Sequence, residues 1–224
     1  MLLGQAARAL ACKTYDRHMS SAERAYEHTK QRIIRGELPG GALLSEGVVC
    51  QELGISRTPV HEAFLRLAAE QLLTLESRKG AVVRPMSPSE SADVLEMREA
   101  VEASAATRAL RGGPRPDLVP VLDDLLRDQA DAIAEHDVDR FVDADDAFHT
   151  AVVAAAENPV AVHFTRLLHD RQQRLRHQLI RVRPEQLHPA LDQHRALARA
   201  VAAGDAARYA EVLRDHVAGH RGAL

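Results

Sequence analysis

The chain has 224 residues, more than the roughly 100–150 residues of a common single domain, so we expect two domains. Hydrophobic residues make up 46% of the sequence and charged residues 27%, as in ordinary globular proteins. No apolar run approaches the roughly 20 residues of a membrane span, so no membrane helix is expected. The net charge of −3 argues against a protein that binds polyanions without specificity.

The N-terminal stretch and the cysteines bear on the cellular compartment. We expect residues 1–22 to form a disordered cytoplasmic tail rather than a signal peptide, because no cleavage-site pattern follows the first short stretch. Met19 would also be a natural first residue. Cys12 and Cys50 give neither a disulfide framework nor a metal-ligand spacing, which indicates a reducing cytoplasm.

Two short helices separated by a tight turn are predicted after a first helix at residues 24–36. Ser45 and Ser56 are typical N-cap residues, and Gly54 between them is typical of a helix end. The second short helix carries an apolar stripe with helical spacing, formed by Val60, Ala63, Phe64 and Leu67. Its opposite face presents Arg57, Thr58 and His61 to solvent. This arrangement is typical of a helix-turn-helix.

A basic hairpin is predicted directly after this pair of helices. Residues 72–76 and 81–84 read as short strands around a tip at residues 77–80, which contains Arg78, Lys79 and Gly80. A basic hairpin behind a recognition helix is suited to contacting phosphates or the minor groove. Residues 23–86 carry nine basic and eight acidic side chains, so the pattern, and not the charge, indicates DNA binding.

Residues 36–41, 44–46, 53–60 and 80–83 together resemble the winged helix-turn-helix of GntR-family regulators. The resemblance implies operator contacts from Arg57 and from the tip at Lys79. The candidate DNA-binding residues are Ser45, Ser56, Arg57, Thr58, His61, Arg78, Lys79 and Gly80. His61 and Gly47 stand where the family has arginine in most or some members, which implies weaker phosphate binding or a different operator. Gln71 replaces a glycine that is common before the wing.

The second half, residues 87–224, is predicted to be an all-α antiparallel helical bundle, because it contains no useful period-two alternation. The expected helices span residues 89–110, 117–135, 138–156, 158–182, 184–203 and 205–220. The chain is therefore expected to be mainly α, with a winged helix-turn-helix at residues 23–86 in front of the bundle.

Asp145 and His149 lie four residues apart on a predicted helix, so both project from one face. Such a pair can chelate a divalent ion. It can equally form a plain hydrogen bond with no ion, and the spacing alone does not decide between the two.

The sequence around this pair, residues 143–149 followed by 156–158, resembles the FCD effector domain of the FadR subgroup. The resemblance implies a metal site formed by Asp145, His149, His194 and His216, with Zn, Ni or Mn as the ion. It also implies that the ion helps to hold an acidic effector, with Arg98 and Asn158 as candidate effector contacts. A salt bridge between Arg98 and Glu102 on the surface is the alternative for the arginine.

The leading hypothesis is a homodimeric repressor that binds a palindromic operator and responds to a small organic acid, with no membrane association. Two alternatives stay open. A metal-dependent hydrolase would use the ion to activate water, but no H-E-x-x-H motif or obvious general base accompanies the ligands. An architectural DNA-binding protein would show no ligand-dependent change in DNA affinity.

Overall fold

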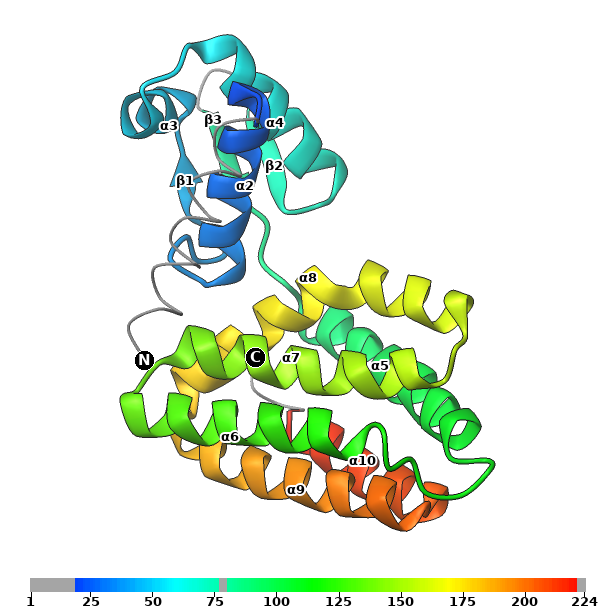
Figure 1. Cartoon of the computed structure of the whole chain (residues 1–224). Coiled ribbons are helices and arrows are strands. Elements are labelled where there is room, and N and C mark those ends of the chain that lie inside the picture. Colours follow the sequence, from blue (N-terminus) through cyan, green and yellow to red (C-terminus); the bar gives the residue numbers. More distant parts are fainter. Residues whose placement is uncertain (1–18, 77–79, 221–224) are drawn as a thin grey trace. The chain divides into compact units, whose positions relative to one another are not determined.

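The computed structural model describes residues 19–76 and 80–220. The chain divides between Pro85 and Met86 into two compact units, a winged domain and a helical domain (Figure 1). The mainly helical fold predicted from the sequence is confirmed. Residues 1–18 of the predicted tail, and Arg78 and Lys79 in the wing, lie outside the described residues.

The winged domain combines three helices and a small antiparallel sheet within its described part. Its elements are α2 (Ser21–Ile34), β1 (Leu43–Leu44), α3 (Glu46–Leu53), α4 (Arg57–Ala69), β2 (Leu73–Glu76) and β3 (Gly80–Val83). The first helix begins earlier than predicted, because the Ser20 hydroxyl accepts a hydrogen bond from Glu23 N and caps it at Ser21. Residues 21 and 22 therefore belong to a helix and not to the predicted tail.

The sheet has the strand order β1-β3-β2, with Leu44 opposite Ala81 and Leu73 opposite Val83. The four residues of the predicted stripe on α4 are completely buried against it. Gly80 has a φ of +99°, and a Cβ atom there would lie 2.4 Å from the carbonyl oxygen of Leu44. Glycine is therefore required where β3 begins beside β1.

The turn between α3 and α4 has the predicted form. Gly54 ends α3 in the left-handed conformation at a φ of 64°, and the Ser45 hydroxyl caps α3 by accepting from Gly47 N. Ser56 occupies the N-cap position of α4, but its side chain makes no capping hydrogen bond. Its hydroxyl is thus left to interact with solvent or a ligand.

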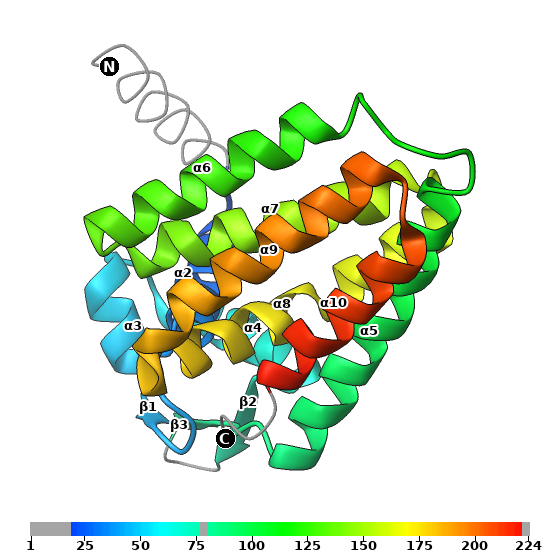
Figure 2. The ribbon, with the colours of Figure 1, turned by 90° about the horizontal axis from the view of Figure 1, so that it is seen from below.

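The helical domain is a bundle whose helices lie close to their predicted positions (Figure 2). They are α5 (Pro88–Ala109), α6 (Val119–Glu135), α7 (Val138–Ala155), α8 (Pro159–Val182), the short 3₁₀ helix η1 (Pro184–Gln186), α9 (Leu187–Ala203) and α10 (Ala206–Gly219). Side chains of Ser87, Asp137, Asn158 and Asp205 cap four of the helix starts. No helix within the described ranges is long and apolar enough to cross a membrane.

The hydrophobic core of the bundle surrounds a group of buried polar residues. Apolar side chains from α5, α6, α7, α8, α9 and α10 form its main cluster, with Phe148 and Tyr209 fully buried. The pairs α6–α7 and α9–α10 are helical hairpins closed by His136–Asp137 and Gly204–Asp205. The neighbours of Phe148 on the inner face of α7 are Asp145 and His149, both buried.

Candidate functional sites

The recognition helix α4 presents the predicted DNA-binding side chains on its exposed face. Ser56, Arg57 and Thr58 at its start are all exposed. His61 is also exposed, and its Nδ1 lies 2.7 Å from Oε1 of Glu46 in the first turn of α3. A carboxylate therefore lies beside one of the predicted DNA-binding side chains.

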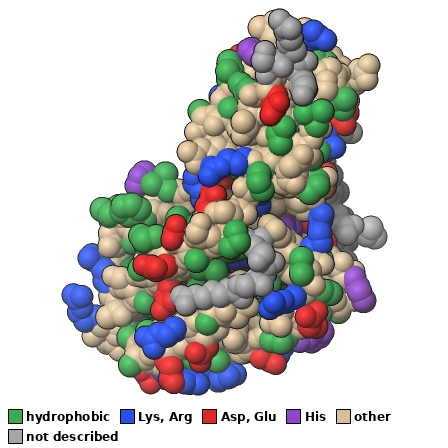
Figure 3. All heavy atoms as spheres, turned by 180° about the vertical axis from the view of Figure 1, so that it is seen from behind, with side chains coloured by type: hydrophobic (Ala, Val, Ile, Leu, Met, Phe, Trp, Pro, Cys, Tyr) green, Lys and Arg blue, Asp and Glu red, His purple; other side chains and the backbone are tan. Residues whose placement is uncertain are grey.

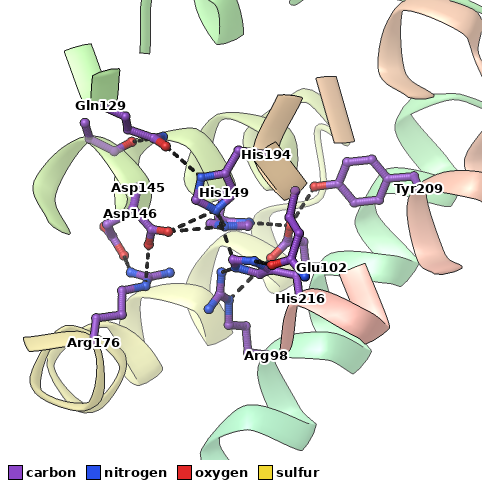
Figure 4. A network of polar contacts seen from close by, with 12 residues as sticks. Arg98, Glu102, Gln129, Asp145, Asp146, His149, Arg176, His194, Tyr209 and His216 are labelled. Carbon is purple, nitrogen blue, oxygen red and sulfur yellow. Dashed lines mark hydrogen bonds and ion pairs between the residues drawn. The ribbon is translucent and has the colours of Figure 1, made fainter. Parts of the chain in front are cut away.

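The four predicted metal ligands converge at the centre of the helical domain (Figure 4). Asp145 and His149 come from α7, His194 from α9 and His216 from α10. All four side chains are buried, and one ligand atom from each lies within 4.8 Å of all the others. Residues separated by more than 70 positions in the sequence thus meet at one point.

The spacing of these atoms matches the edges of a coordination polyhedron. The Nε2 atom of His194 lies 3.2 Å from Nε2 of His149, 3.4 Å from Nε2 of His216 and 3.1 Å from Oδ1 of Asp145. A tetrahedral ion with ligand bonds of about 2.0–2.1 Å would place neighbouring ligand atoms about 3.3 Å apart. The residues present can therefore hold a first-row divalent metal ion.

The Nδ1 atom of each imidazole lies within hydrogen-bonding distance of a side-chain oxygen. Nδ1 of His149 lies 2.6 Å from Glu102 Oε1, Nδ1 of His194 lies 2.7 Å from Gln129 Oε1, and Nδ1 of His216 lies 2.9 Å from Gln193 Oε1. Because an oxygen acceptor requires a proton on Nδ1, each neutral ring presents an unprotonated Nε2 to the cluster. Three such lone pairs at this separation could coordinate one divalent ion.

Two arginines and two further carboxylates surround the cluster. Arg176 on α8 pairs with Asp145 and, at 2.9 Å, with Oδ1 of Asp146. Arg98 on α5 lies 3.7 Å from Glu102 and donates to Nε2 of His216 at 3.3 Å. The predicted ion pair between Arg98 and Glu102 is thus present, but both side chains are buried and not on the surface.

Burial and these charges set the protonation of the cluster. Burial and, next to it, the Arg98 guanidinium lower the pKa of His149 to about 4, although Glu102 and Asp145 act to raise it. Burial alone would raise the pKa of Asp145, but Arg176 and His194 hold it well below its usual range. At neutral pH the site therefore offers a carboxylate and neutral imidazole, the forms that bind metal.

The histidine and carboxylate of α7 do not form the plain hydrogen bond that was the alternative to a metal site. Oδ1 of Asp145 lies 3.8 Å from Nε2 of His149, beyond hydrogen-bonding distance. That oxygen is instead closer to His194.

A cavity of about 40 Å³ adjoins the cluster and is bounded by α7, α8, η1, α9 and α10. Its polar lining comprises Asp145, Arg176, Gln186, Gln193, His216 and His220. Asn158, a candidate effector contact, does not line this cavity. Its side chain caps α8 by accepting hydrogen bonds from the backbone N–H groups of Val160 and Ala161.

Sequence reasoning missed three residues of the site. Gln129 on α6 holds His194, Gln193 on α9 holds His216, and Arg176 on α8 pairs with Asp145. Buried and exposed polar residues occur together on α8 and α9, so spacing gave no signal. Their burial on the inner faces of their helices would have indicated them, but burial is known only from the structure.

Comparison with known proteins matches each of the two domains to a known family. Residues 21–83 match the family described as bacterial regulatory proteins, gntR family, and residues 93–219 match the FCD domain family. The HTH-type transcriptional repressor GlaR of Escherichia coli K12 is 31% identical over 86% of this chain and 90% of its own length. The gluconate operon transcriptional repressor of Bacillus subtilis is 33% identical over 60% of this chain and 54% of its own length.

A solved structure shares the fold. The crystal structure of a putative transcriptional regulator GntR from Rhodococcus sp. RHA1 has a TM-score of 0.75 and 24% identity, covering 92% of this chain and 100% of that one. The domains and the relatives are those of regulators and not of enzymes. The chain belongs to the GntR family of bacterial regulatory proteins and carries an FCD domain behind its winged helix-turn-helix.

Proposed function

We propose that the protein is a cytoplasmic transcriptional repressor whose affinity for operator DNA is modulated by a small carboxylate bound in its helical domain. Two relatives, GlaR and the gluconate operon repressor, are named as repressors, which supports this direction of control. The exposed start of α4, with Arg57 and Thr58, supports DNA reading by that helix. Arg78, Lys79 and Gly80 at the wing tip are proposed to contact the backbone or the minor groove.

The observation that carries the effector part of the proposal is the convergence of Asp145 Oδ1 with three imidazole Nε2 atoms. We propose that they bind one divalent ion, with Zn, Ni or Mn as candidates, since the local supply of metal often decides among them. Four ligands complete a tetrahedral site, whereas a six-coordinate ion would keep open positions that can accept an effector carboxylate; Arg98 beside the cluster adds positive charge.

The protein is proposed to act as a homodimer on a palindromic operator, with recognition helices about 34 Å apart on successive major grooves. Val160, Phe164 and Leu167 lie at i, i+4 and i+7 on α8 and are 60%, 44% and 55% exposed. Figure 3 shows hydrophobic side chains along one edge of the helical domain, whereas acidic and basic side chains are interspersed over the rest of the drawn face. An exposed apolar row of this kind supports burial against a second subunit.

Effector binding would then change DNA affinity by favouring one arrangement of the two DNA-binding domains. The test is a titration of labelled operator with metal-loaded protein, with and without a panel of organic acids. The proposal expects one acid to shift the dissociation constant at least fivefold, and the shift to vanish after chelation. Affinity that no acid changes would favour an architectural role instead.

Substitutions in the winged domain test the DNA-binding part of the proposal. Arg57→Ala should cost roughly 1–3 kcal/mol of specific binding, whereas a change at Lys79 should weaken binding to all sequences and lower the salt slope by about one. Arg24→Ala on α2 provides a matched control outside the recognition helix. Unchanged operator affinity in the Arg57 variant would contradict the docking of α4.

A further inference from the structure

A carboxylate from the preceding helix holds His61 on the recognition helix. The His61 side chain is 57% exposed, and its Nδ1 lies 2.7 Å from Oε1 of Glu46. His61 lies one turn after Arg57 and Thr58, so these three side chains share the exposed face of α4. Glu46 is the first residue of α3, directly after the capping residue Ser45. The contact therefore links α3 and α4 at the face that carries the predicted DNA-binding side chains.

The carboxylate determines which hydrogen-bonding group the imidazole offers to a ligand. A carboxylate only accepts hydrogen bonds, so Nδ1 of His61 carries a proton in this contact. In the neutral ring the other nitrogen, Nε2, is then an acceptor. Nε2 of His61 has no hydrogen-bond partner among the described residues. A neutral His61 therefore offers a lone pair, and not a donor, at the exposed face of α4.

A second contact between a histidine and a glutamate in the winged domain has different surroundings. Nε2 of His28 on α2 lies 3.2 Å from Oε2 of Glu52 on α3, but the same oxygen accepts from Arg32 Nη1 at 2.7 Å. The Glu52 carboxylate is thus already paired with a cation. In the described part of the chain, Glu46 has no arginine or lysine partner. The Glu46 carboxylate therefore acts on the His61 ring.

The bases differ in what they offer to an acceptor in the major groove. Adenine and cytosine present amino groups there, at N6 and N4, whereas guanine presents O6 and N7 and thymine presents O4. An unprotonated Nε2 can accept a hydrogen bond from an amino group, but it cannot pair with the acceptor atoms of guanine or thymine. An arginine at the same place would do the opposite, because it donates to O6 and N7 of guanine.

We propose that Glu46 fixes the tautomer of His61, so that Nε2 of His61 accepts a hydrogen bond from the amino group of an adenine or a cytosine in the operator. Guanine and thymine are disfavoured at that position. His61 is then a specificity-determining residue, and Glu46 is a positioning residue that acts through it. The inference rests on the proposed function, since it requires α4 to enter the major groove. It adds the class of base that α4 selects at one position.

The test selects bound sequences from a random pool of duplex DNA with the full chain at pH 8, where exposed imidazole groups are ordinarily neutral. The wild type should enrich adenine or cytosine at one position. Placing guanine or thymine there should weaken binding about tenfold, as expected for one lost hydrogen bond, measured by fluorescence anisotropy. His61→Arg should change the selected base at this position to guanine and leave the other positions unchanged. His61→Ala should select no base there.

Two further variants separate the role of Glu46 from a general effect on the domain. The amide in Glu46→Gln can donate to Nδ1 as well as accept from it, so both tautomers of His61 become available. Discrimination against guanine should then fall roughly threefold or more, even where overall affinity rises. His28→Arg is the matched control and should leave the selected bases unchanged.

The outcomes distinguish this inference from the proposed function. Selection of the same base at every position by the wild type, His61→Arg and His61→Ala would overturn the inference. Selection of guanine or thymine by the wild type at the position that changes in these variants would overturn it too, as would unchanged discrimination in Glu46→Gln. A wild-type protein that enriches no sequence from the pool would instead contradict the reading of DNA by α4 in the proposed function.

Discussion

His149 and His194 present their Nε2 atoms to each other at a distance of 3.2 Å, while the Nδ1 atom of each ring faces an oxygen. The oxygen belongs to Glu102 for the first ring and to Gln129 for the second. Two neutral imidazoles in this tautomer have no proton to share, so their lone pairs oppose each other. A metal ion bound between them would turn this repulsion into coordination.

The side chain that holds Nδ1 of His194 should therefore control metal affinity. Gln129 is fully buried, accepts from His194 Nδ1, and donates its own amide to the carbonyl of Ala144. Gln129→Leu removes the acceptor and should lower zinc affinity by roughly 10–100-fold, measured by competition with a chromogenic chelator. Gln129→Glu keeps an acceptor oxygen and should hold zinc within a few fold of wild type. Equal affinity in the leucine variant would contradict the tautomer argument.

The metal-free protein should lose stability as the pH falls below about 6.5. Burial, reinforced by Arg98, lowers the pKa of His149 to about 4 and that of His220 to about 3. Both histidines titrate near 6.5 in an unfolded chain. Between these values the unfolded state binds more protons, so the free energy of unfolding should fall by about 1.4 kcal/mol per pH unit for each proton taken up.

Urea unfolding of chelator-treated protein at pH 7, 6 and 5 measures this slope. Saturating zinc should keep the protein more stable at each pH where the ion stays bound, because it binds only the folded state. A free energy of unfolding that stays constant from pH 7 to pH 5 in the metal-free protein would contradict the burial of neutral imidazoles.

Replacing Gln71 should stabilise the winged domain. Gln71 has a φ of 62°, a conformation that disfavours side chains with a Cβ atom. Its amide oxygen accepts a hydrogen bond from Arg84, but this contact is exposed. Gln71→Gly should raise the free energy of unfolding by about 0.5 kcal/mol, once the added freedom of the unfolded chain is subtracted.

Gln71→Ala provides the control, because it removes the same hydrogen bond and keeps the Cβ atom. Thermal unfolding followed by circular dichroism should place the glycine variant above wild type and the alanine variant at or below it. The reverse order would show that the hydrogen bond to Arg84 outweighs the backbone conformation.

Operator binding should respond to the pair formed by His61 and Glu46. The Glu46 carboxylate lies 2.7 Å from His61 on the face that carries Arg57. His61→Arg should strengthen binding and steepen the dependence of log affinity on log salt concentration by about one, as expected for one added phosphate contact. Glu46→Gln should also strengthen binding, because it removes a negative charge near DNA. No change in either variant, measured by fluorescence anisotropy at several salt concentrations, would place this pair away from the DNA.

Local sequence signals predicted most of the fold, because caps and periodicity act within one element. The N-cap Ser45, the left-handed Gly54 and the stripe on α4 all have their predicted structural roles. The strand Leu43–Leu44 was not predicted, since two residues show no alternation and their partner β3 lies far along the chain. Gln71, which replaces a glycine common before the wing, occupies a left-handed position, the conformation that favours glycine.

Of the site, the sequence and the family resemblance predicted only the four clustered side chains. The spacing of Asp145 and His149 indicated a shared face, and the family resemblance supplied His194 and His216. Gln129 and Arg176 hold the ligands from other helices. A polar residue on a helix with both polar and apolar residues is predicted to be solvent-exposed, because only the packing of the helices shows which face is buried.

The central claim is that Asp145 and the three histidines bind one divalent ion per chain. Elemental analysis of untagged protein purified without chelators, then reloaded with zinc, nickel or manganese, tests it most directly. We predict about one equivalent in the wild type and a marked loss in His194→Ala, together with a lower melting temperature, while the exposed control His163→Ala retains its metal. Less than a tenth of an equivalent in the wild type after reloading with each metal would contradict the claim.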